Sequence, residues 1–178
     1  MADGLEELFG RAREAKLNKR FGEAQVALRD AAARLRSDPM DLRGVMALRE
    51  LAETERKLGE REAAREHYEQ AVQQLRLHSD ALALAHTVRH LGDVHRELGR
   101  SDLAEPCYRE ALELYDAHTE ASRLDVANAL RSMAVLKEDT GAAAEAAALW
   151  KRARELYQAT GIQAGVDEST RRLARLTS

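Results

Sequence analysis

Four arginines recur along the chain at nearly constant spacing. Arg49, Arg89, Arg131 and Arg171 are separated by 40, 42 and 40 residues. A guanidinium group offers a planar fork of N–H donors that suits carboxylates and phosphates. If equivalent helices carry these arginines on one face, the row would bind an acidic peptide. The competing interpretation is a solvated surface with local ion pairs, because Arg49 and Arg89 each have an acidic residue four positions later, whereas Arg131 and Arg171 do not.

The remaining reactive residue types favour no catalytic chemistry. His86 and His90 stand four residues apart, a spacing that could hold zinc on one helix face, but no second pair of this kind occurs, so surface histidines are the simpler interpretation. Cys107 is the single cysteine, which excludes an internal disulfide framework and a cysteine-based zinc site. No phosphate-binding glycine loop, nucleophile elbow or zinc-protease motif is present. We therefore expect no enzymatic activity, no cofactor and no metal.

Composition predicts a chain that is helical almost throughout. Of its 178 residues 33% are charged, only 4% are aromatic and two are prolines. A formal net charge of −3 argues against nucleic acid as a partner, since phosphate binding usually needs a basic stripe. No apolar run approaches the roughly 18–20 residues that span a bilayer, and the N-terminus lacks the apolar core of a signal peptide. We expect a cytoplasmic protein that binds no membrane.

Small residues recur with a period of 40–42, and this repeat must position the arginines. One set consists of Ala12, Ala52, Gly92, Ala134 and Ala174. A second set follows twelve residues later, at Ala24, Ala64, Ala104 and Ala146, and four residues after each of these stands a large side chain, at Leu28, Tyr68, Tyr108 and Trp150. Between the two sets lie turn glycines at Gly59, Gly99 and Gly141, with Lys19 at the first of these turns. This pattern predicts helical hairpins whose backbones approach closely at the small residues.

The predicted organisation is a single repeat domain over residues 1–178. Its hairpins cover residues 3–38, 40–79, 80–119 and 121–161, and a capping helix covers residues 164–177. Polar outer residues on the last helix are expected of a cap that shields the final repeat.

The third repeat reads V-x2-L-G-x2-H from Val88, then A-x3-Y-x2-A from Ala104. It resembles the tetratricopeptide repeat, whose pattern is W-x2-L-G-x2-Y, then A-x3-F-x2-A. The period exceeds the usual 34 residues, and A-E-P-C-Y-R-E-A-L-E-L-Y is similar to the longer repeats of kinesin light chain. The resemblance implies an all-α fold, a right-handed superhelix with a concave groove lined by the first helix of each hairpin. Such grooves commonly bind extended peptides or partner helices, and the fold is rarely catalytic.

In similar proteins the position of the arginine row faces this groove. Phe9 occupies that position in the first repeat, and with Met46 it would form a hydrophobic subsite at the N-terminal end. The alternative is that Phe9 packs against a neighbouring helix or within a homodimer contact. The residues that we predict to contact a peptide are Phe9, Met46, Arg49, Arg89, Asn128, Arg131 and Arg171.

The sequence therefore predicts a non-catalytic module that binds a peptide or a partner helix, with the arginine row favouring an acidic partner. One alternative is a structural unit that self-assembles, forming a homodimer through its N-terminal end. Another is a regulatory sensor fragment that acts on an enzyme in trans.

Overall fold

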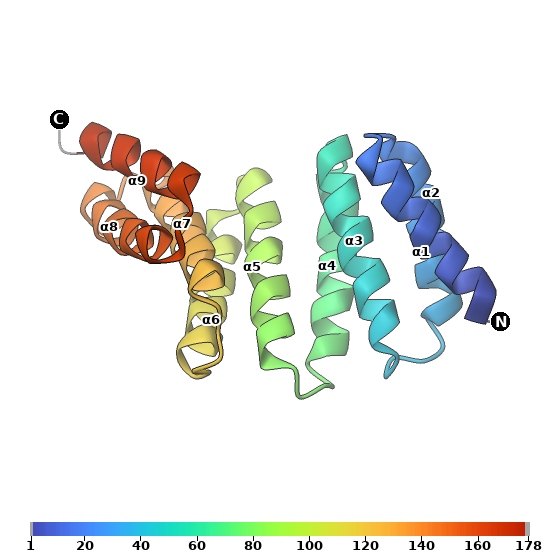
Figure 1. Cartoon of the computed structure of the whole chain (residues 1–178). Helices are drawn as coiled ribbons and strands as arrows, with labels where there is room; N and C mark the ends of the chain where they lie inside the picture. Colours follow the sequence, from blue (N-terminus) through green and yellow to red (C-terminus); the bar gives the residue numbers. More distant parts are fainter. Residues whose placement is uncertain (1, 177–178) are drawn as a thin grey trace. The chain divides into compact units, whose positions relative to one another are not determined.

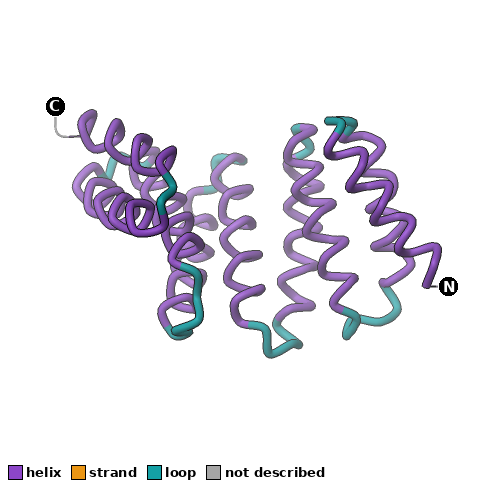
Figure 2. Tube along the Cα trace, in the orientation of Figure 1, coloured by secondary structure: helices purple, strands orange, loops and turns teal. Residues whose placement is uncertain are grey.

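The computed structural model describes residues 2–176, and the side chains of residues 4–176. Within this range the chain forms nine helices and no strand (Figures 1 and 2). The helices are α1 (Ala2–Leu17), α2 (Phe21–Leu35), α3 (Leu42–Leu58), α4 (Arg61–Leu75), α5 (Ala81–Glu97), α6 (Ser101–Asp116), α7 (Arg123–Asp139), α8 (Ala143–Thr160) and α9 (Gln163–Leu176). The all-α fold of four helical hairpins followed by a last helix is confirmed. Position 177 of the predicted capping helix, and the ends 1 and 178 of the predicted domain, lie outside the described residues.

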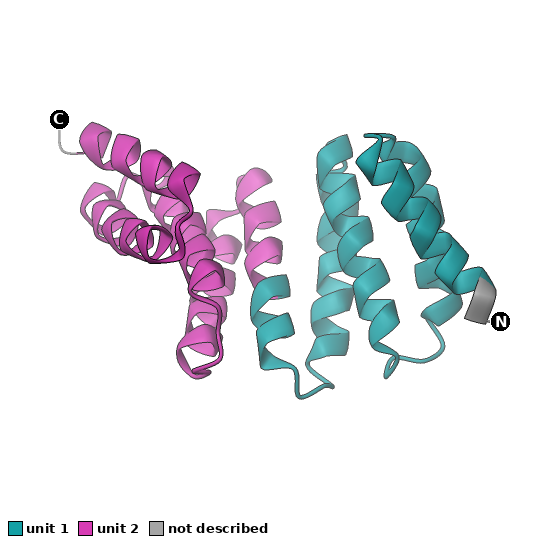
Figure 3. Cartoon of the chain, in the orientation of Figure 1, with its two compact units in different colours: residues 1–87 teal, residues 88–178 magenta. Residues whose placement is uncertain are grey.

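The chain divides into two compact units (Figure 3). Unit 1 covers residues 1–87 and contains α1 to α4 and the first part of α5, and unit 2 covers residues 88–178 and contains the rest of α5 and α6 to α9. The organisation as a single domain stays a prediction.

Each hairpin packs around the small residues that the repeat pattern identifies. Ala12, Ala52 and Ala134 of the first helices are fully buried, as are their counterparts on the second helices. Gly92 takes the same place in α5, where a Cβ atom would lie 2.7 Å from the ring of Tyr108. Since that distance is shorter than any normal carbon–carbon contact, glycine is the residue that lets this tyrosine pack against the helix backbone.

The turns inside the hairpins share one backbone conformation. Gly59, Gly99 and Gly141 have φ between 74° and 83°, in the left-handed region that favours glycine. Lys19 holds the equivalent place in the first hairpin with φ of 57°, and the N–H of Arg20 donates to the carbonyl of Ala15, 2.8 Å away, as in the glycine turns. The first turn therefore keeps the common geometry without the residue suited to it.

Lys19→Gly is expected to raise the free energy of unfolding by about 0.5–1 kcal/mol. Placing a residue with a Cβ atom in the left-handed region costs about 1–2 kcal/mol, and glycine would remove this cost. Glycine also gives the unfolded chain more conformational freedom, which offsets part of the gain in stability. Urea denaturation followed by circular dichroism measures the change. Asn18→Gly is the control, because Asn18 lies next to the strained position without sharing its conformation. Equal stabilisation by both variants would contradict the strain argument.

Candidate functional site

Side chains from the first helices of unit 2 enclose a polar pocket of about 260 Å³. We call it the first-helix pocket, because α5, α7 and α9 provide its lining. The lining residues are Asp93, Arg96, Arg131, Ser132, Val135, Asp139 and Arg172. It contains three guanidinium groups and two carboxylates, and it lies on the helices that the repeat pattern assigns to a groove.

Arg131 is held in this pocket by a carboxylate from the next first helix. Its Nε and Nη2 atoms donate to the two carboxylate oxygens of Glu168, at 2.7 and 2.9 Å. The hydrogen bonds to Glu168 raise the pKa of Arg131 above the usual value for arginine. The sequence showed no acidic residue on α7 that could pair with Arg131, and the partner comes instead from α9, 37 residues later. Arg131 is thus already paired within the chain.

Arg89 is the most enclosed member of the arginine row, with 7% of its surface exposed. Its guanidinium lies 3.6 Å from the carboxylate of Asp93 on the same helix, the local pairing that the sequence suggested. Asp93 also accepts a hydrogen bond of 2.9 Å from the hydroxyl of Tyr108. Burial and the neighbouring carboxylate of Asp93 raise the pKa of Tyr108, so this phenol stays protonated as a donor.

Two arginines that the sequence analysis did not select, Arg96 and Arg172, also line the pocket. Arg96 donates to Asp139 at 3.1 Å, and Arg172 donates to Glu138 at 3.0 Å. Each of these hydrogen bonds uses one N–H of a guanidinium group that has five. The sequence signal for Arg96 was its place four residues after Gly92, one helical turn along the same face.

Asn128 and Arg171 lie apart from the lining of the first-helix pocket. Asn128 accepts a hydrogen bond of 2.8 Å from the hydroxyl of Tyr157. Arg171 is exposed on α9 and lines a shallow pocket of about 400 Å³ together with Glu168 and neighbouring arginines of the same helix. Glu168 therefore lies between the two C-terminal arginines of the row, bonded to one and adjacent to the other.

In unit 1 the predicted residues are distributed differently. Arg49 contacts the imidazole of His86, with 2.6 Å between Nη2 and Nδ1. Phe9 is half-buried and packs against the apolar core of α1, α2 and α3, whereas half of the surface of Met46 is exposed. The packing of Phe9 is the alternative that the sequence left open. A joint hydrophobic subsite of Phe9 and Met46 stays a prediction.

The described part of the chain contains no group of three or more histidine, cysteine, aspartate or glutamate side chains placed to hold a metal ion. Cys107 is half-buried. Among the described helices, none combines the length and the apolar character needed to cross a bilayer.

Residues 44–117 match the family model of the tetratricopeptide repeat. No curated protein matches the sequence. Among solved structures, BtubC (BKLC) from P. vanneervenii aligns with a TM-score of 0.72 at 20% identity, over 97% of this chain and 81% of BtubC. The apo form of RapI aligns with a TM-score of 0.85 at 14% identity, over 94% of this chain and 60% of RapI. MamA aligns with a TM-score of 0.66 at 15% identity, over 99% of this chain and 93% of MamA.

At these identities the solved structures establish the fold alone, and the likeness to kinesin light chain stays a prediction. The matched stretch, α3 to α6, contains the repeat pattern from which the family was recognised. The family match therefore identifies residues 44–117 as tetratricopeptide repeats, and the three solved structures share the fold over 94–99% of the chain.

Proposed function

We propose that this chain binds a peptide or a partner helix through the first-helix face of unit 2, without catalysis. A tetratricopeptide-repeat protein is a protein–protein interaction module, and its fold is generally non-catalytic. The observation that carries the proposal is the first-helix pocket, a concave site of about 260 Å³ lined mainly by charged side chains. An adaptor role and a cytoplasmic location remain predictions.

The charge balance of this face favours an acidic partner. Three arginines line the first-helix pocket against two aspartates, and Arg171 adds an exposed cation beside Glu168. A guanidinium that spends one or two N–H groups on an internal partner keeps others for a ligand carboxylate. Since Arg89, Arg96, Arg131 and Arg172 are already paired within the chain, the preference for an acidic partner rests on their remaining donors together with the exposed Arg171.

An acidic peptide is expected to lose affinity when two arginines are removed. The probe is a fluorescein-labelled 12-residue peptide of alternating Glu and Ala, with its Lys counterpart as the comparison, measured by fluorescence anisotropy. Arg131→Ala with Arg171→Ala should weaken binding of the Glu peptide about five- to tenfold, about 1–1.4 kcal/mol, and flatten its salt dependence. Glu168→Gln should strengthen binding, because it removes the carboxylate that now occupies Arg131.

The matched control is Arg36→Ala with Lys151→Ala, which removes two exposed positive charges outside the pockets. Circular dichroism melts of every variant show that the fold is retained. Equal weakening by the control, or equal binding of the Glu and Lys peptides, would refute the acidic-peptide proposal.

A further inference from the structure

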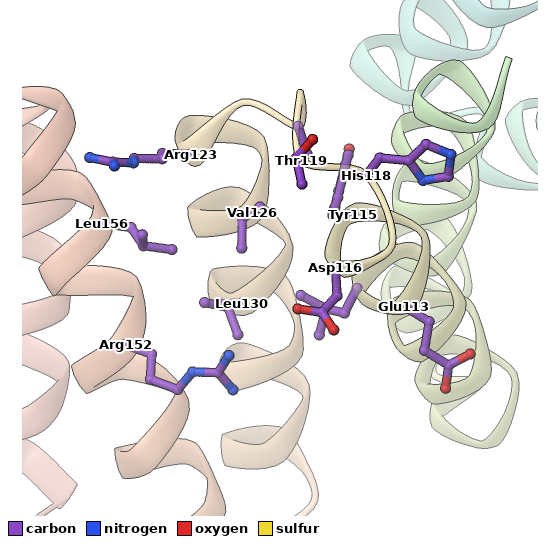
Figure 4. Close-up of a pocket in the computed structure, with 12 residues that line it drawn as sticks. Glu113, Tyr115, Asp116, His118, Thr119, Arg123, Val126, Leu130, Arg152 and Leu156 are labelled. Carbon is purple, nitrogen blue, oxygen red and sulfur yellow. The ribbon is translucent and has the colours of Figure 1, made fainter.

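A second pocket in unit 2 lies on the other helices of the hairpins. It has a volume of about 490 Å³ and lies between α6 and α8, with the N-terminal half of α7 as its floor (Figure 4). We call it the second-helix pocket. It shares no lining residue with the first-helix pocket.

The floor of the second-helix pocket is apolar. Leu112 of α6, Val126 of α7 and Leu156 of α8 are half-buried and pack against a buried cluster that includes Leu130 and Tyr157. Leu130 itself lines the pocket. Each of the half-buried side chains still exposes carbon surface, so an apolar group placed in the pocket would remove that surface from water.

The rim is charged, and the two signs are segregated. Glu113 and Asp116 stand on α6, whereas Arg123 begins α7 and Arg152 lies on α8. In Figure 4 Arg152 lies below Leu130 and Asp116 lies to its right, so the two charges reach the pocket from different helices. All four rim residues are exposed, and within the described residues none of them forms an ion pair.

An apolar centre with a polar, solvent-accessible rim is the anatomy of a protein interface. The lining also includes the polar side chains of Tyr115, His118 and Thr119, whereas the charged groups stand on the exposed rim, as in a protein interface. The segregated charges require an occupant that presents a cation to α6 and an anion to α7 and α8.

We propose that the second-helix pocket binds a peptide segment of a partner protein, in which an apolar side chain lies between a basic and an acidic residue. The apolar side chain sits on Val126, Leu130 and Leu156. The basic residue pairs with Asp116 and Glu113, and the acidic residue pairs with Arg152 and Arg123. This binding is independent of acidic-peptide binding in the first-helix pocket.

The test uses fluorescein-labelled peptides with Lys-Leu-Leu-Glu or Glu-Leu-Leu-Lys at their centre, because either chain direction can meet the two walls. The neutral comparison carries Gln-Leu-Leu-Gln. We expect at least one charged peptide to bind more tightly than the neutral peptide. Arg152→Glu and Asp116→Lys should each weaken that binding about fivefold or more, since a favourable ion pair becomes a repulsion.

Lys151→Glu is the matched control, because it makes the same charge change one residue away, on an exposed side chain outside the pocket. The proposal is overturned if Lys151→Glu weakens binding as much as Arg152→Glu, or if the neutral peptide binds equally well. Displacement of the peptide by free leucine at equal concentration would indicate a small-molecule site and would also overturn it. Binding should be unchanged in the Arg131→Ala, Arg171→Ala variant, and its loss there would show that the peptide occupies the first-helix pocket instead.

Discussion

Trp150→Ala is expected to lower the free energy of unfolding by about 3–5 kcal/mol, the range for truncating a buried aromatic side chain. Trp150 has no exposed surface, and it packs with Ala134, Val135 and Ala146 in the core of unit 2. Its indole N–H donates to the carboxylate of Glu138. Alanine would leave a cavity and an acceptor without its donor. Urea denaturation followed by circular dichroism at 222 nm measures the loss.

Trp150→Phe separates the two contributions. Phenylalanine keeps most of the ring volume but loses the N–H donor, so we expect a cost of about 1–2 kcal/mol. If the alanine and phenylalanine variants were equally destabilised, the volume of the side chain would not be the main source of its contribution. Leu28 fills the equivalent position of the first hairpin without any polar group, so this site does not need a hydrogen bond to be occupied.

His67→Leu is expected to lower the free energy of unfolding by about 2–4 kcal/mol. Glu55 of α3 is fully buried, and His67 Nδ1 lies 2.7 Å from its carboxylate. Gln25 and Arg29 reach the same carboxylate only at longer distances, 3.4 and 3.5 Å. Removing the closest hydrogen-bond partner of a buried carboxylate leaves that carboxylate poorly satisfied in a medium of low dielectric constant. Chemical denaturation of the variant measures the effect.

The double variant Glu55→Leu, His67→Leu should be less destabilised than His67→Leu alone, because both polar partners leave together. The first hairpin supports this expectation, since Ala15 and Ala27 occupy the equivalent buried positions with no charge. A double variant that loses the sum of the two single effects would show that the buried pair contributes no coupling.

The repeat period was sufficient to predict the helices and their pairing. Spacings of 40–42 residues between small side chains locate the close approach of each hairpin, and the structure buries these side chains in the hairpins but leaves Ala174 of α9 exposed. The turn at Lys19 was also visible in the alignment, because a repeat constrains the backbone even where the preferred residue is missing. Because the same small residues meet in every hairpin, a single alignment of the repeats predicts the packing of each hairpin.

The electrostatics of the candidate site could not be predicted in the same way. Local spacing suggested a partner for Arg89 and none for Arg131, yet Arg131 binds Glu168 on another helix. The i to i+4 spacing identifies only ion pairs within one helix. Which side chains of two different helices meet depends on the rotation of each helix about its axis. The second-helix pocket was missed for the same reason, since its lining comes from three helices and the loop between α6 and α7.

The short turns inside the hairpins have a consequence for how the chain folds. Within each hairpin only two or three residues separate the two helices, so most of the contacts that stabilise it join residues close in sequence. Closing such small loops costs little entropy, and chains dominated by local contacts cross their folding barrier in microseconds to milliseconds. A hairpin can therefore form while the rest of the chain is still unstructured. Growth of the repeat array can then start at any hairpin and proceed by adding neighbours to it.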